Sequence, residues 1–138
     1  MLMWVNYDLP FVPVLSYWLG GISIYDLEET LGEQLWVFNP NEKDDREKII
    51  KEFILRRFDD LTYRHRFLLL EVLKSALSSP GFDFSKEFES DYDDPRSMAW
   101  DETEIDDPRQ FFEDIYKLAS EEWKEDLDKA SLEDPSTW

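Results

Sequence analysis

The sequence has 138 residues, of which 42% are hydrophobic and 16% aromatic, and 33 acidic against 15 basic residues give a formal net charge of −18. This length suits one domain with its own core, and so high a share of aromatic residues argues against a disordered chain. A strongly negative protein repels nucleic acid and anionic lipid and attracts basic surfaces. The absence of cysteine excludes disulfides, thiolate nucleophiles and cysteine-based metal sites.

The N-terminal region lacks the features of a secretory signal. Residues 1–41 contain no Lys or Arg, so the positively charged start of such a signal is missing. The longest apolar stretch there, Leu9 to Leu19, is about half as long as a membrane span and contains two prolines. Together with the absence of cysteine, these features predict a soluble, cytoplasmic protein.

Residues 1–40 leave the choice between helix and strand open. Residues 9–20 fit a short buried helix, and residues 26–32 fit a second one that Asp26 can cap. The run Gln34–Phe38 fits either a strand or an extended buried segment.

The clearest pattern predicts two helices, at about 41–59 and 60–78, which form an antiparallel pair because their connection is short. Asn41 can cap the first helix. Apolar residues recur in this helix at helical spacing, namely Ile49, Ile50, Phe53, Ile54 and Phe58. The second helix has a wider apolar stripe, which indicates a central helix, formed by Tyr63, Phe67, Leu68, Leu69, Leu70, Val72, Leu73, Ala76 and Leu77.

An irregular segment and a third long helix are predicted to follow. Residues 82–107 alternate aromatic and acidic residues without a lasting helical period, so we expect the aromatics to pack on the helices and the carboxylates to face water. Asp107 and Pro108 then suit the start of a helix at about 108–127. Residues 131–138 are expected to fray. The prediction is one mainly α domain over residues 1–138.

The sequence contains little that indicates catalysis. His65, the only histidine, lies between two arginines and is expected to be a helix-surface or half-buried residue rather than a general base. The four glycines form no phosphate-binding loop. Asp91, Asp93 and Glu102 have the spacing of a calcium loop, but Arg96 stands where that loop needs a glycine. We therefore expect a protein without enzymatic activity, metal or cofactor.

The acidic residues are unevenly distributed along the chain. The net charge is −5 over residues 1–41, +1 over residues 42–79 and −14 over residues 80–138. A need for solubility would not require this asymmetry. Tyr and Trp can anchor a partner, while carboxylates steer and select it. The predicted partner-binding residues are Glu89, Asp91, Tyr92, Asp93, Asp94, Trp100, Asp101, Glu102, Glu104 and Asp106.

As a cysteine-free, highly acidic and aromatic-rich domain, the sequence resembles in overall character the immunity proteins of bacterial polymorphic toxin systems, in particular those of contact-dependent growth inhibition. The resemblance implies a cytoplasmic protein that binds and neutralises a cognate toxin domain with a basic surface, often a nuclease. It rests on no shared motif, so it transfers no site residues. Two alternatives stay open, a nucleic-acid mimic that inhibits DNA-binding proteins and a non-catalytic regulatory subunit.

Overall fold

The computed structural model describes residues 1–89 and 97–138, and within them the protein is mainly α. The described residues form two isolated β-bridges, Met3 with Pro10 and Ser23 with Met98, and no longer strand. The helical elements are η1 Leu15–Ile22, η2 Glu28–Gly32, α1 Glu33–Leu35, α2 Lys43–Ile49, η3 Ile50–Leu55, η4 Arg56–Phe58, α3 Tyr63–Leu77, η5 Phe84–Phe88, α4 Pro108–Glu122, α5 Lys124–Ser131 and η6 Pro135–Thr137.

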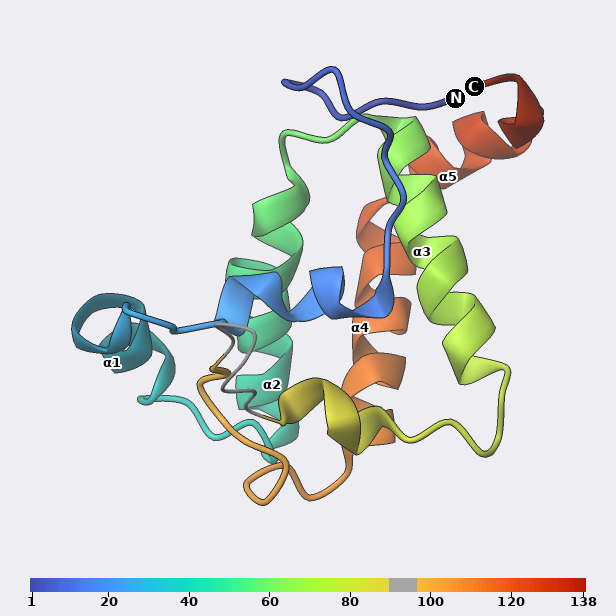
Figure 1. Ribbon diagram of the computed structural model, residues 1–138. Coiled ribbons are helices and arrows are strands. Elements are labelled where there is room, and N and C mark those ends of the chain that lie inside the picture. Colours follow the sequence, from blue (N-terminus) through green and yellow to red (C-terminus); the bar gives the residue numbers. More distant parts are fainter. Residues whose placement is uncertain (90–96) are drawn as a thin grey trace.

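The two helices predicted at 41–59 and 60–78 are present. The first consists of α2, η3 and η4, which follow one another without a gap from residue 43 to residue 58, and the second is α3. They run in opposite directions, and α4 lies between them (Figure 1). Because α4 packs against α2, η3 and α3, it joins the two helices into one core, an arrangement that the sequence did not predict.

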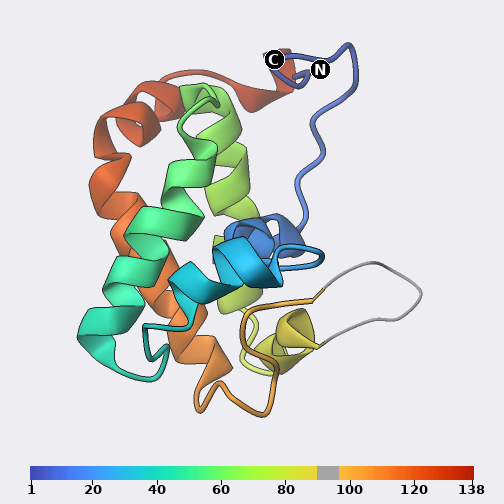
Figure 2. The same ribbon diagram turned by 90° about the vertical axis from the view of Figure 1, so that its left-hand side faces the viewer.

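The predicted third helix begins as expected and ends earlier. The side chain of Asp107 accepts a hydrogen bond from the backbone N–H of Gln110 at 3.1 Å, and Pro108 occupies the first turn. The helix ends at Glu122, and Trp123 adopts φ −100° and ψ 18° before α5 begins. The chain bends at this point (Figure 2), and the ring of Trp123 stacks on that of Trp18 at 5.7 Å.

The helix η1 crosses the face formed by the 43–58 run and α4 (Figure 1). Its side chains of Trp18, Leu19 and Ile22 are fully buried. A Cβ atom built on Gly21 would lie 2.0 Å from the carbonyl oxygen of Phe53, so a glycine is required for η1 to approach η3 so closely. Gly21 lies inside η1, which continues to Ile22, whereas the predicted helix ended at residue 20.

The predicted strand or buried segment at Gln34–Phe38 is wrong. Residues 33–35 form the single turn α1, and the two residues that follow are exposed, Trp36 to 49% and Val37 to 75%. The sequence pattern failed here because five apolar or neutral residues are too few to show a helical period.

His65 has a structural role. It is buried, and its Nε2–H donates a hydrogen bond to the carbonyl oxygen of Met3 at 2.7 Å. Because that carbonyl can only accept, the ring proton is placed on Nε2. The other ring nitrogen, Nδ1, can then accept a hydrogen bond from the hydroxyl of Thr62 at 2.6 Å. The ring therefore joins the N-terminal segment to the start of α3, and it is more buried than predicted.

The C-terminal residues pack against the helices, which corrects the prediction of a frayed tail. The ring of Trp138 is buried against Phe67, and its indole N–H donates to Glu133 at 2.9 Å. Glu133 also accepts hydrogen bonds from the hydroxyl of Tyr63 at 2.6 Å and from Arg64 at 2.9 Å. These contacts hold the C-terminus beside the N-terminus (Figures 1 and 2).

This attachment of the C-terminal residues is expected to depend on pH. The hydrogen bond from Tyr63, followed by that from Arg64, lowers the pKa of Glu133. A lowered pKa stabilises the folded state above the ordinary glutamate pKa of about 4.3, and the contribution is lost as pH falls through the folded value. The indole N–H resonance of Trp138 should therefore shift in NMR spectra only below the pH at which an ordinary glutamate titrates. If Glu133→Gln leaves the same pH dependence, another group is responsible.

Candidate functional site

Four of the predicted partner-binding residues, Asp91, Tyr92, Asp93 and Asp94, lie outside the described residues. Of the six others, Glu89 is exposed after the end of η5, and the remaining five belong to the segment from Trp100 to Asp106.

Trp100 is buried, with 5% of its surface exposed, so it does not present its ring to a partner as predicted. The cause is backbone pairing between residues 97–99 and the segment after η1. The N–H of Ile24 donates to the carbonyl of Ser97 at 2.7 Å, and the N–H of Ala99 donates to the carbonyl of Ile22 at 2.9 Å. These two bonds hold the segment that leads into Trp100 against the buried end of η1.

Asp101 and Glu104 shape a tight turn. The side chain of Asp101 accepts hydrogen bonds from the hydroxyl and the backbone N–H of Thr103. The carboxylate of Glu104 accepts from the backbone N–H of Asp101 at 3.1 Å. The hydroxyl of Thr103 contributes most to lowering the pKa of Asp101, followed by the backbone N–H of the same residue. Asp101 therefore keeps its charge more readily, and both side chains fix the backbone of the turn.

Asn41 attaches this turn to the start of α2. Its side-chain N–H donates to the carbonyl of Glu104 at 2.9 Å, and its side-chain oxygen accepts from the backbone N–H of Asp106 at 2.9 Å. The predicted role of Asn41 as a helix cap is wrong, because α2 begins after Glu42 without a side-chain cap. The residue instead bridges two acidic segments that lie more than sixty positions apart in sequence.

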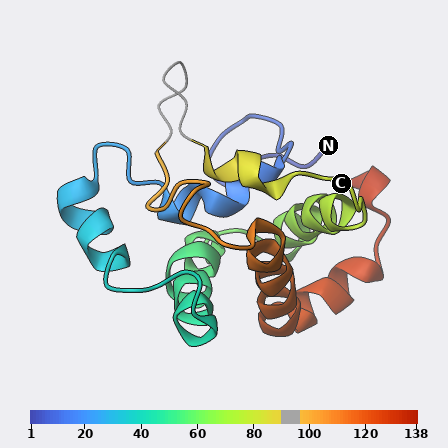
Figure 3. The ribbon, with the colours of Figure 1, turned by 90° about the horizontal axis from the view of Figure 1, so that it is seen from below.

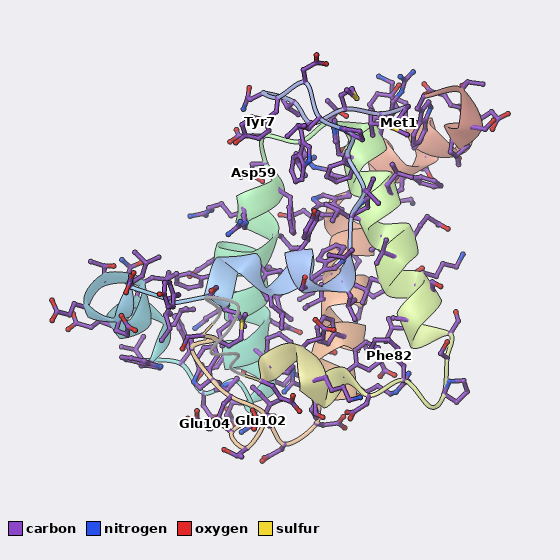
Figure 4. The ribbon with its side chains drawn as sticks, in the orientation of Figure 1. Met1, Tyr7, Asp59, Phe82, Glu102 and Glu104 are labelled. Atoms are coloured by element: carbon purple, nitrogen blue, oxygen red, sulfur yellow. The ribbon has the colours of Figure 1, made fainter. Side chains whose placement is uncertain are left out.

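We define the acidic face as the exposed or half-buried carboxylates of the two segments that this bridge joins. They come from the start of α2 and from the 101–106 turn, and Figure 4 shows Glu102 and Glu104 next to each other at this end of the molecule. Within the described residues, Glu102 and Asp106 have no hydrogen bond or ion pair on their side chains. The acidic face comprises Glu42, Asp44, Asp101, Glu102, Glu104 and Asp106.

An exposed aromatic ring that the sequence analysis missed is attached to the same segment. The indole N–H of Trp36 donates to the carbonyl of Ala99 at 2.8 Å, two residues before the acidic turn begins. The ring also lies over Gly32, where a Cβ atom would be 3.1 Å from it. Trp36 is therefore held in one orientation although half of its surface is exposed, and the more exposed Val37 follows it. In the sequence, the exposure of Trp36 is indicated only by the short length of the apolar run that contains it.

Among the described residues, no group of three or more His, Cys, Asp or Glu side chains could hold a metal ion. No helix of the same residues is both long and apolar enough to span a membrane. Comparisons with models of protein families, with curated proteins and with solved structures find no match for this chain.

Proposed function

We propose that this protein is an immunity protein that binds a cognate toxin domain with a basic surface, most simply a nuclease, through the acidic face and Trp36. The observation that carries the proposal is the bridge by Asn41, which attaches the turn with the unpaired carboxylates of Glu102 and Asp106 to the acidic start of α2. Like charges repel, so gathering them costs stability unless a cationic partner neutralises them.

Two features of the described residues support such an interface. Carboxylates without partners steer a basic surface toward the protein and select it. A half-exposed Trp with its indole N–H already bonded offers a large apolar contact that loses little conformational freedom on binding. A nuclease presents Lys and Arg to the phosphates of its substrate, and carboxylates can bind the same cationic groups in place of phosphates.

Charge reversal on the acidic face is expected to slow association with the partner. The Glu102→Lys and Asp106→Lys double variant should associate at least about tenfold more slowly at low salt, and added salt should reduce this difference. The partner would be purified as the stoichiometric complex from native lysate, and association would be measured by stopped-flow fluorescence.

A matched control carries the same change in net charge elsewhere. Glu121→Lys with Glu125→Lys places two lysines at the junction of α4 and α5, whereas the acidic turn leads into the opposite end of α4 (Figure 1). If this control slows association as much as the first variant does, the effect comes from overall charge and the acidic face is not the interface. Inhibition of a panel of unrelated DNA-binding enzymes would indicate a nucleic-acid mimic instead.

A further inference from the structure

A second candidate site lies beside η1, against the buried residues Phe11, Phe58 and Leu69, and it differs in chemistry from the acidic face. Two hollows meet at Arg57, and both are also lined by Ser16 and Gly20. The first has a volume of about 320 Å³, and its walls are apolar and mainly aromatic, formed by Trp4, Phe11, Tyr17, Phe58, Leu61 and Leu69. The second has a volume of about 490 Å³, and its apolar residues are Tyr25, Leu27, Leu31 and Met98. Volumes of this size are typical of small-molecule sites.

The aromatic walls of the first hollow are fixed by their contacts with one another. The ring of Trp4 meets that of Phe11 edge-on at 4.7 Å and lies 5.9 Å from that of Tyr17. Phe58 is held by an edge-on contact with Trp18 at 5.3 Å. Because these rings already pack in preferred geometries, the hollow is formed before any ligand enters.

Arg57 differs from the arginines that stabilise the fold. Arg46, Arg64 and Arg66 each form an ion pair with a carboxylate. Arg57 is exposed, and within residues 1–89 and 97–138 its guanidinium has neither an ion pair nor a hydrogen bond.

Gly20 leaves room for this guanidinium. A Cβ atom built on Gly20 would lie 2.7 Å from Cζ of Arg57, so glycine lets the guanidinium lie directly over the backbone of η1. Ser16 also lines both hollows, and its hydroxyl has no hydrogen bond within the described residues. The junction of the hollows therefore offers a fork of N–H donors and one hydroxyl.

We infer that these hollows bind a small apolar monocarboxylate, with its ring or chain between the aromatic walls and its carboxylate on Arg57 and Ser16. A guanidinium matches a carboxylate with two parallel hydrogen bonds. A single negative charge fits better than a phosphate dianion, because the net charge of −18 repels a dianion more strongly. This inference does not depend on the proposed function, since it uses other residues.

The test compares an acid with the alcohol of the same shape. 2-Naphthylacetate and 2-(2-naphthyl)ethanol are titrated into the ¹⁵N-labelled protein, and the indole N–H of Trp4 and the Nε–H of Arg57 are followed by NMR. The acid should bind more tightly than the alcohol and shift both resonances. In Arg57→Gln the affinity for the acid should fall about tenfold or more, while the affinity for the alcohol stays unchanged. Ser16→Ala should weaken binding of the acid to a smaller extent.

The neighbouring residue provides a matched control. Arg56→Gln removes the same charge from an exposed position that borders neither hollow, and it should leave both affinities unchanged. Thermal melting of each variant checks that it remains folded. Equal affinity for acid and alcohol, equal loss in the two arginine variants, or no binding of the acid at about 1 mM would overturn the inference.

Discussion

Replacement of Trp18 by alanine is expected to lower the free energy of unfolding by about 3–5 kcal/mol, the range for removal of a large buried aromatic side chain. Trp18 is fully buried where η1 meets α3 and the bend between α4 and α5. Its indole N–H donates to the carbonyl of Leu69 at 3.1 Å, and its ring contacts Phe58 as well as Trp123. Chemical denaturation followed by circular dichroism measures the change.

The control for this prediction keeps an aromatic ring at this position and removes the indole N–H. Trp18→Phe retains most of the packing, and the lost hydrogen bond together with the smaller ring should cost about 1–2 kcal/mol. A loss for Trp18→Ala no greater than that for Trp18→Phe would mean that the ring is not the contact that joins these helices.

Replacement of Trp36 by alanine is expected to accelerate dissociation of the proposed complex about thirtyfold, which corresponds to about 2 kcal/mol for a residue that dominates an interface. The association rate should change little, because Trp36 carries no charge and steering depends on the carboxylates. The expected pattern is the reverse of that for Glu102→Lys with Asp106→Lys. Surface plasmon resonance at fixed salt concentration separates the two rates.

A second exposed aromatic residue serves as the control for Trp36. Tyr7 is 62% exposed in the N-terminal segment, far from the acidic turn (Figure 4), and Tyr7→Ala should leave dissociation unchanged. Because Trp36 also donates a hydrogen bond to Ala99, the melting temperature of Trp36→Ala has to be compared with that of the unchanged protein. Unchanged dissociation in a folded Trp36→Ala variant would remove Trp36 from the interface.

Local patterns in the sequence predicted the helices and missed the contacts between them. Apolar spacing identified the 43–58 run and α3, and the Asp–Pro pair located the start of α4. Spacing shows which face of a helix is apolar, but it does not show which other face covers it. Figure 3 shows α4 beside the 43–58 run and α3, and this packing depends on contacts between residues that meet only in the folded protein.

The candidate site illustrates the same limit at single residues. Asn41 can equally cap a helix or bridge two segments, and the choice depends on Glu104 and Asp106, which lie far along the chain. Trp100 is as aromatic and as close to acids as an interface residue would be, yet the backbone pairing of Ala99 with Ile22 leads it into the core. Composition predicted an acidic site with an aromatic ring, and long-range contacts decided which ring is exposed.

The place of α4 in the core also constrains how the protein folds during its synthesis. The ribosome releases the 43–58 run and α3 before α4 has been made, so their apolar surfaces emerge without the helix that later covers both. Until the residues up to Trp123 have left the exit tunnel, the nascent chain presents these surfaces to other molecules. The nascent protein should therefore bind chaperones until α4 has emerged and complete its core only after that.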